Sequence, residues 1–177
     1  MTFDLKKYIR SIPDYPKKGI LFRDITTLIK NPEAFKYTND QIIEIGKKLD
    51  FDKVAAIESR GFVFASTVSY QLEKPFILLR KKNKLPAEVH SVDFELEYGT
   101  ATIEVHKDSI EKGEKILVID DLIATGGTAE AAAKIVEISG GKVAGFIFVI
   151  NLFDLPGNSL LKKKGYFTKS LVEFPGH

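Results

Sequence analysis

The stretch 116–133 constrains the fold more than any other part of the chain, and it reads ILVIDDLIATGGTAEAAA. Its first four residues, Ile116–Ile119, are apolar and predict a short strand buried on both faces of a sheet. Two acids follow at the expected end of this strand. From Thr128, the expected N-cap, apolar residues recur with the period of an amphipathic helix. The stretch therefore predicts a strand, an acidic pair, a glycine-rich turn and a helix.

The turn before this helix has the properties of a phosphate-binding loop. The first amides of a helix lack partners within the helix and attract anions, and glycine lets the backbone approach a ligand closely. A phosphate does not need the paired acids, so we expect them to hold sugar hydroxyls or a hydrated metal. A solvated acidic turn is the alternative. The phosphate- and ribose-binding candidates are Asp120, Asp121, Ala124, Thr125, Gly126, Gly127 and Thr128.

The size and composition of the chain limit its class. Its 177 residues, 44% of them apolar and 28% charged, are enough for one soluble globular domain spanning 1–177. The net charge of +2 gives no support for binding to nucleic acid or to a membrane. The chain has no cysteine, no secretory signal and no apolar stretch of about 18 residues. We therefore expect a cytoplasmic protein.

Short apolar runs alternate with helical patterns along the chain, and this alternation predicts an α/β fold. Such a fold has a mostly parallel twisted sheet flanked by helices. Between 91 and 106, apolar and polar residues alternate on both sides of Tyr98 and Gly99, which indicates a hairpin or a mobile flap. We expect a connector at 11–19 and an extended piece at 20–25. Further strands are expected at 54–57, 75–79, 116–119, 143–150 and 167–172. Helices are expected at 1–10, 32–49, 62–72, after Thr128, and as a short helix between a loop at 156–157 and the last strand.

Three charged groups stand at the expected ends of strands. They are Glu58–Gly61, Arg80–Lys82 and the acidic pair. Ligands of parallel α/β sheets bind at the carboxyl ends of the strands, so these groups should meet at one anionic site. Arg60, which precedes a glycine, fits contact with an oxyanion, although a surface arginine in a tight turn is the alternative. For the basic run, which we define as residues 80–84, the alternative is a solvated charged surface.

The acidic pair and the loop after it closely resemble the phosphoribosyl-pyrophosphate motif of the type I phosphoribosyltransferases. Other segments resemble the adenine-specific members of that family, and they occur in the same order along nearly the whole chain. These segments are 12–16, 19–26, 59–62, 80–86, 96–99 and 174–177. The resemblance implies the family fold, with a small hood built near 1–30 and 150–177 and a flexible hairpin flap.

The resemblance also implies roles for residues around the phosphates. The acidic pair would contact the ribose hydroxyls, and the loop after it would hold the 5′-phosphate. Glu97 would transfer the catalytic proton from a flap that includes Tyr98, with a solvated turn acid as the alternative. Arg60 would assist the departure of pyrophosphate as a second catalytic residue. The implied pyrophosphate-binding residues are Ser59, Arg60, Arg80, Lys81 and Lys84.

For the base, the resemblance implies a pocket formed by four residues. Phe22 and Leu152 would stack on its two faces, and backbone groups of Leu21 and Arg23 would read its edge. Plain core packing is the alternative for the two stacking side chains. Two departures from the adenine-specific pattern concern the outer wall of this pocket, namely Asn151 and Asn158.

Together these features imply transfer of phosphoribose from phosphoribosyl pyrophosphate to adenine, which gives AMP and pyrophosphate. Mg²⁺ is expected to arrive with the substrate, because the three histidines show no ligand spacing and no protein-held metal is expected. A homodimer is implied by the resemblance alone. Two alternatives stay open. One is the same transfer to a 6-oxopurine such as hypoxanthine, guanine or xanthine, and the other is a regulator that senses phosphoribosyl pyrophosphate.

Overall fold

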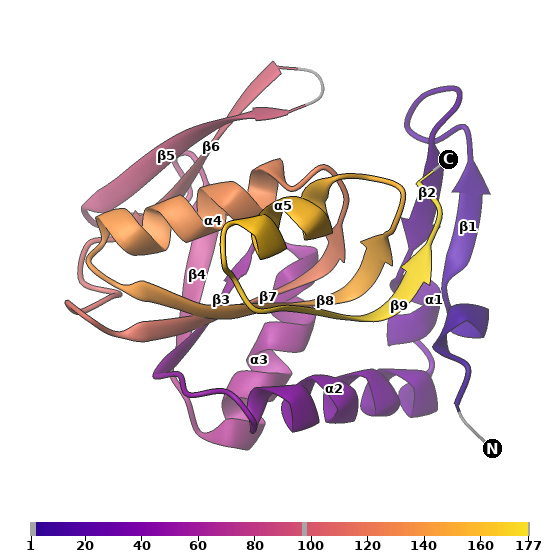
Figure 1. The fold of residues 1–177 in the computed structure, drawn as a ribbon, viewed down its shortest axis with the longest axis horizontal. Coiled ribbons are helices and arrows are strands. Elements are labelled where there is room, and N and C mark those ends of the chain that lie inside the picture. Colours follow the sequence, from indigo (N-terminus) through magenta and orange to yellow (C-terminus); the bar gives the residue numbers. More distant parts are fainter. Residues whose placement is uncertain (1–2, 97–98, 177) are drawn as a thin grey trace.

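The centre of the protein is a twisted sheet of seven strands (Figure 1). We describe it from a computed structural model that covers residues 3–96 and 99–176. From β4 to β9, neighbouring strands are parallel, whereas β6 and β5 are antiparallel, so the predicted mostly parallel sheet is confirmed. The strands are, in spatial order, β5 (Val89–Leu96), β6 (Gly99–His106), β4 (Phe76–Lys81), β3 (Lys53–Ile57), β7 (Lys115–Ile123), β8 (Lys142–Leu152) and β9 (Thr168–Phe174).

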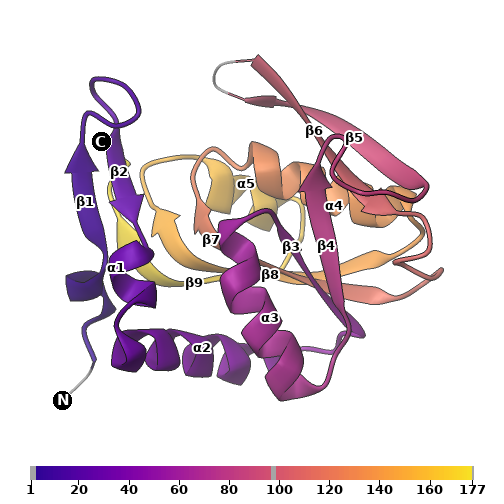
Figure 2. The same cartoon turned by 180° about the vertical axis from the view of Figure 1, so that it is seen from behind.

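Helices cover both faces of this sheet (Figure 1, Figure 2). Helices α2 and α3 lie on one face, and α4 and α5 lie on the other. Among the described residues, no helix is both long and apolar enough to cross a membrane. The helices are η1 (Leu5–Tyr8), α1 (Thr26–Ile29), α2 (Pro32–Gly46), α3 (Arg60–Leu72), α4 (Gly127–Ile138) and α5 (Gly157–Lys163).

Helix α2 begins where the sequence predicts. The side chain of Asn31 accepts a hydrogen bond from the backbone N–H of Ala34 at 2.9 Å, and Pro32 occupies the first helical position. The helix ends at Gly46, three residues before the predicted boundary at Leu49. The short helix α1 was not expected, since its four residues are too few to show a helical period.

The central strand β7 is buried on both of its faces, as its apolar run predicts. Ile116 and Val118 pack into the core beneath α4, and Leu117 and Ile119 pack into the core beneath α2 and α3. At most 2% of each of these side chains is exposed. Burial of such side chains stabilises a fold by about 1.5–3 kcal/mol each relative to exposure, so this strand fixes the layers around it.

A separate antiparallel pair of strands contains the first residues of the predicted base pocket. Strands β1 (Arg10–Pro13) and β2 (Leu21–Asp24) lie beside β9, away from the centre of the main sheet (Figure 1). The prediction of a connector at 11–19 was therefore wrong for its first residues. Proline favours turns in a sequence pattern, but Pro13 stands at the end of an edge strand, where its missing N–H costs nothing.

Strands β5 and β6 form the expected hairpin, paired from Val89 and His106 to Leu96 and Gly99. It rises above α4 on the same side of the sheet as the loop between β1 and β2 (Figure 1). Glu97 and Tyr98, the predicted acid and its flap neighbour, lie outside the described residues.

Candidate active site

A cavity of about 490 Å³ lies where the carboxyl ends of β3 and β7 meet the hairpin. Its walls come from five parts of the chain: the end of β3, the end of β7 with the following loop and the start of α4, Lys81 of β4, Phe148 of β8, and the hairpin. The lining residues that indicate the chemistry of the cavity are Ser59, Arg60, Lys81, Asp120, Asp121 and Ala124–Thr128. The predicted convergence of strand ends at one site is therefore present for these residues.

The glycine-rich loop delivers the first turn of α4 into this cavity. The N-cap is Gly126, with φ of 96°, and not Thr128 as predicted. A left-handed N-cap without a side-chain hydrogen bond cannot be recognised from a Ser/Thr pattern, which explains this error. The first backbone amides of the helix, beginning at Gly127, have no carbonyl partner within the helix and can donate to an anion. The helix dipole adds partial positive charge there.

The loop is fixed from behind by the start of α5. The backbone N–H of Gly157 donates to the carbonyl of Ala124 at 2.9 Å. A Cβ on Gly126 would lie 2.9 Å from the Cα of Gly157, and a Cβ on Gly157 would lie 2.5 Å from the carbonyl oxygen of Ala124. The two backbones therefore approach so closely that only glycine fits at both positions. Gly157 was predicted only as part of a loop, and nothing in its local sequence signals this contact.

The acidic pair lies inside β7, because the strand continues to Ile123 instead of ending before the acids as predicted. Its parallel ladder with β8 includes Asp120 opposite Phe148. The backbone N–H of Asp121 donates to Asp120 Oδ1 at 2.8 Å. Burial raises the pKa of Asp120 well above its ordinary value, and the neighbouring charge of Asp121 raises it further.

Arg60 connects the acidic pair with the predicted base pocket. Its Nε lies 3.0 Å from Asp121 Oδ2, and its guanidinium lies 5.4 Å from the ring centroid of Phe22. Asp121 is 4% exposed, and its Oδ2 accepts no aligned hydrogen bond from the described part of the chain. This ion pair therefore supplies charge, while the buried oxygen keeps its capacity to accept a hydroxyl hydrogen.

The basic run divides into residues at the cavity and residues outside it. Lys81 lines the cavity. Arg80 instead donates to Glu58 Oε2 at 2.8 Å and to the carbonyl of Lys84 at 3.3 Å. Burial acts to raise the pKa of Glu58, but hydrogen bonds from Arg80 and from the Lys81 amide lower it overall. Glu58, which the sequence analysis placed in a charged group at the end of a strand but gave no role of its own, thus fixes β3 to the start of the basic run.

The predicted base-binding residues lie next to this cavity and are not among the described residues that line it. Phe22 is half-buried and makes an edge contact with Tyr15 at 5.2 Å between ring centroids. Leu152 is buried in the core at the end of β8. Leu21 and Arg23 flank Phe22 in β2. The contact of Phe22 with Arg60 places β2 next to the acidic pair.

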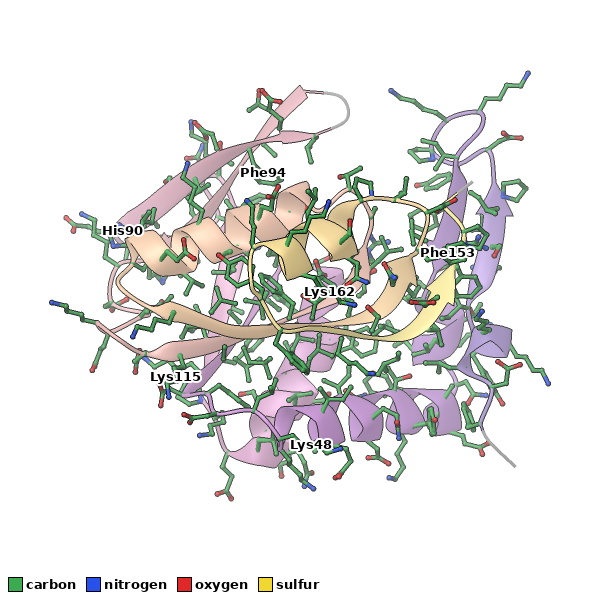
Figure 3. All side chains as sticks on the ribbon, viewed as in Figure 1. Lys48, His90, Phe94, Lys115, Phe153 and Lys162 are labelled. Carbon is green, nitrogen blue, oxygen red and sulfur yellow. The ribbon has the colours of Figure 1, made fainter. Side chains whose placement is uncertain are left out.

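The hairpin forms the remaining wall. Phe94, Leu96 and residues 101–103 line the cavity, and Phe94 points from β5 toward α4 (Figure 3). A Cβ on Gly127 would lie 3.1 Å from the carbonyl oxygen of Glu95, so the hairpin passes directly over the phosphate-loop candidate. No group of three metal-binding side chains occurs within residues 3–96 and 99–176.

Comparison with known proteins matches this geometry to a family. The phosphoribosyl transferase domain model matches residues 26–173. The adenine phosphoribosyltransferase of Pelagibacter ubique is 72% identical over 174 residues, which cover 98% of this chain and 99% of that protein. The chain belongs to the type I phosphoribosyltransferase family, among the adenine phosphoribosyltransferases.

Solved adenine phosphoribosyltransferases have the same fold. The enzyme from Thermoanaerobacter pseudethanolicus superposes with a TM-score of 0.91 at 45% identity, covering 96% of this chain and 98% of that chain. The enzyme from Saccharomyces cerevisiae, solved with an imino-altritol bisphosphate and adenine, gives a TM-score of 0.87 at 34% identity, covering 95% and 96%. The resemblance inferred from the sequence motifs is thereby confirmed at the level of family and fold.

Proposed function

We propose that this phosphoribosyltransferase transfers phosphoribose from phosphoribosyl pyrophosphate to adenine, forming AMP and releasing pyrophosphate. One observation carries the proposal. A helix N-terminus suited to a phosphate, a pair of acids suited to ribose hydroxyls and two cations suited to pyrophosphate line one cavity. The relatives that the chain matches over nearly its full length are named for the same activity.

The substrate is proposed to lie along the cavity with its three parts on separate groups. The 5′-phosphate takes the amides and hydroxyls of Thr125–Thr128, where the helix dipole favours an anion. The ribose hydroxyls donate to Asp120 and Asp121. The pyrophosphate lies toward Ser59, Arg60 and Lys81, whose charges oppose its own. Arg80 and Lys84 are not among the described residues that line the cavity, and Arg80 is considered again with the proposed dimer.

The base is proposed to lie on Phe22, with Leu152 on its other side. Stacking on an aromatic ring contributes about 1–3 kcal/mol per base and tolerates any base, so it does not select adenine. Selection is assigned to backbone groups of Leu21 and Arg23, because adenine and 6-oxopurines present opposite donor and acceptor patterns. A site that leaves buried polar groups unpaired rejects the wrong base by orders of magnitude.

The reaction exchanges one bond at the anomeric carbon for another. The bond from ribose C1 to the pyrophosphate oxygen breaks and its electron pair leaves with pyrophosphate, while N9 of adenine forms the new bond. Positive charge develops on the sugar in the transition state, as in glycoside chemistry. Arg60 and Lys81 stabilise the departing negative charge. Glu97 takes the proton that N9 releases, and closure of the hairpin excludes water from the sugar cation.

Mg²⁺ is proposed to enter with the substrate. Its ligands would be substrate oxygens and water, because Asp120 and Asp121 are assigned to the ribose hydroxyls and no group of three metal-binding side chains occurs among the described residues. When bound to the pyrophosphate, Mg²⁺ would neutralise charge on the leaving group.

The hood is assigned to the β1–β2 pair with the adjoining ends of β8 and β9, which lie side by side (Figure 1, Figure 2).

A homodimer is also proposed, through the face formed by α3 and β4. Tyr70 on α3 is 85% exposed and Leu78 on β4 is 40% exposed. Large exposed apolar groups on neighbouring elements are typical of association surfaces. Arg80 and Lys81 follow Leu78 on the same strand, so a partner docked here would bring basic residues close to both cavities.

The deciding experiment mixes the protein with phosphoribosyl pyrophosphate, Mg²⁺ and one base at a time, and measures the pyrophosphate released. Adenine should be converted at least about a hundredfold more efficiently than hypoxanthine or guanine, since an unpaired buried polar group costs about 1–3 kcal/mol and the two purine edges differ at two positions. Equal turnover of a 6-oxopurine would contradict the base assignment. No turnover with any base would contradict the proposed reaction.

A further inference from the structure

Arg23 is buried in a way that base recognition by its backbone does not explain. Only 5% of the residue is exposed, and a buried arginine is rare unless partners hold its charged group. Its Nη2 donates to the carbonyl of Pro175 at 2.8 Å, and its Nη1 donates to the hydroxyl of Ser11. Its guanidinium also lies 4.5 Å from the ring centroid of Phe174. Two of these three partners belong to one segment, Phe174–Gly176.

That segment is itself fixed to the loop after β8. The backbone N–H of Gly176 donates to Asp154 Oδ1 at 2.6 Å, and the backbone N–H of Phe153 donates to the carbonyl of Phe174 at 3.0 Å. A Cβ on Gly176 would lie 2.9 Å from Asp154 Oδ1. The segment therefore lies in close contact with the main sheet on one side and with Arg23 on the other.

Strand β2 needs such a contact because of its place in the fold. Among the described residues it pairs only with β1, in a sheet separate from the main one, while the phosphate loop follows β7 of the main sheet. Figure 1 and Figure 2 show β2 beside the end of β9. Burial lowers the pKa of Arg23, and the charge of Asp154 partly offsets this effect. Arg23 and the segment Phe174–Gly176 thus join the two sheets where the base has to meet the ribose.

We propose that Arg23, through its side chain, and Asp154, through Gly176, are positioning residues that hold β2 at the correct distance from the ribose site. The inference rests on the proposed function, and specifically on the assignment of the base to β2. Catalysis is sensitive to such placement, because an error of about 1 Å in the position of a reacting group can cost about a hundredfold in rate. Loss of the contact should therefore raise KM for adenine and leave KM for phosphoribosyl pyrophosphate almost unchanged.

The first test compares Asp154→Ala with Asp154→Asn. Alanine removes the acceptor for Gly176, whereas asparagine keeps an oxygen at the same position and removes only the charge. We expect Asp154→Ala to raise KM for adenine about tenfold, which corresponds to about 1.4 kcal/mol, with KM for phosphoribosyl pyrophosphate within about twofold of wild type. Asp154→Asn should restore most of the adenine KM.

The second test replaces Arg23 by lysine, which keeps the charge but lacks the planar fork that reaches Ser11 and Pro175 together. We expect the same selective rise in KM for adenine. Thermal unfolding of each variant separates this effect from loss of fold, and if Arg23→Lys does not fold, the Asp154 pair decides alone.

Equal rises in both KM values, or an unchanged adenine KM in a folded Asp154→Ala protein, would overturn the inference. An equal loss in Asp154→Asn and Asp154→Ala would also overturn it, since charge and not the hydrogen bond would then matter. Failure of the proposed function is seen separately, because wild-type protein would then release no pyrophosphate with adenine.

Discussion

Asp120 is the residue at which stability and the proposed activity conflict most directly. Its carboxyl is partly buried beside a second acid, and both effects raise its pKa. An acid whose pKa is higher in the folded state than in the unfolded state holds its proton longer when folded. The folded state therefore loses stability as pH rises from the ordinary aspartate value through the raised one. The acid that lowers the stability of the folded state is thus the one proposed to accept a hydrogen bond from a ribose hydroxyl.

Replacement of this acid should consequently stabilise the protein and impair it. We expect Asp120→Asn to melt at a higher temperature than wild type at pH 7, with a smaller difference near pH 4, because an ordinary aspartate has a pKa of about 3.9. Binding of phosphoribosyl pyrophosphate should weaken about tenfold or more, since a hydrogen bond to a charged group contributes about 1.5–3 kcal/mol. Thermal unfolding at several pH values and calorimetric titration measure the two effects.

Asp121→Asn is the matched comparison, because it keeps the acid with the raised pKa but removes both a charge that raises this pKa and the ion pair with Arg60. Its melting temperature should gain less over wild type than that of Asp120→Asn as pH rises from 4 to 7, because burial, the larger cause of the raised pKa, remains. A wild-type protein as stable at pH 7 as Asp120→Asn would contradict a raised pKa of Asp120.

Glu97 belongs to the same scale, although it lies outside the described residues and its role follows from the family resemblance. Glutamine has a similar shape but cannot take the proton from N9. We expect Glu97→Gln to slow the chemical step by about 10²–10⁴-fold, the usual contribution of general acid–base catalysis, with little change in binding of phosphoribosyl pyrophosphate. Single-turnover measurement with adenine reports this step directly. A rate within about threefold of wild type would remove Glu97 from the mechanism.

At the scale of elements, the start of α4 depends on the start of α5. Gly126 has a left-handed backbone conformation that is unfavourable for residues with a side chain, and its backbone lies against that of Gly157. The hydrogen bond from Gly157 to Ala124 fixes the same loop. The amides proposed to bind the 5′-phosphate are thus positioned by a helix that is remote in sequence and contributes no residue to the cavity lining given above.

A pair of alanine variants isolates this contact. Gly126 and Gly165 both have positive φ, 96° and 86°, but a Cβ at Gly165 meets nothing within 4 Å. Gly165→Ala should therefore cost only the conformational strain, about 1–2 kcal/mol of unfolding free energy, and leave AMP binding unchanged. Gly126→Ala should cost more and weaken AMP binding at least tenfold. Denaturant unfolding and AMP titration test this pair, and equal behaviour of the two variants would contradict the proposed loop contact.

The sequence predicted the elements whose evidence is local. The apolar run Ile116–Ile119, the Asn31 cap and the alternation around 91–106 each show their structure within a few residues. The wrong predictions concern strand boundaries that are set by pairing with a strand elsewhere in the chain. Strand β7 continues through two acids because β8 pairs with it beyond Ile119, and β1 is a strand because β2 pairs with it.

The candidate site follows the same rule. Motif resemblance selected the acids, the loop and Arg60, and the structure brings these together in one cavity. It could not select Glu58, Gly157 or Asp154, because their contacts join segments that are far apart in sequence. It also grouped Arg80 with Lys81, although a hydrogen bond to Glu58 directs Arg80 elsewhere.

For the whole molecule, the order of strands decides where the site lies. Strands β3 and β7 are neighbours at the centre of the sheet, so the end of each contributes charged groups to one cavity. The hairpin at one side and the β1–β2 pair at the other rise on the same side of the sheet (Figure 1). The face formed by α3 and β4 is the surface proposed above for association with a second copy.

Disruption of that face should give a folded monomer. We expect Tyr70→Glu to shift sedimentation toward the monomer, because a charge would replace an exposed aromatic side chain at the proposed interface. Phe153→Glu is the control, since Phe153 is 57% exposed but lies after β8, away from α3 (Figure 3). A wild-type protein that sediments as a monomer, or a loss of association in both variants, would contradict the assigned interface.

The close approach of Gly126 and Gly157 has a consequence for genetics. Damage from a larger residue in a packed core is often relieved by a smaller residue opposite. Here neither partner has a side chain to shorten, since the contact joins two backbones. A selection for restored growth from a Gly126 or Gly157 variant should therefore return true revertants at the same codon and no compensating change at the partner.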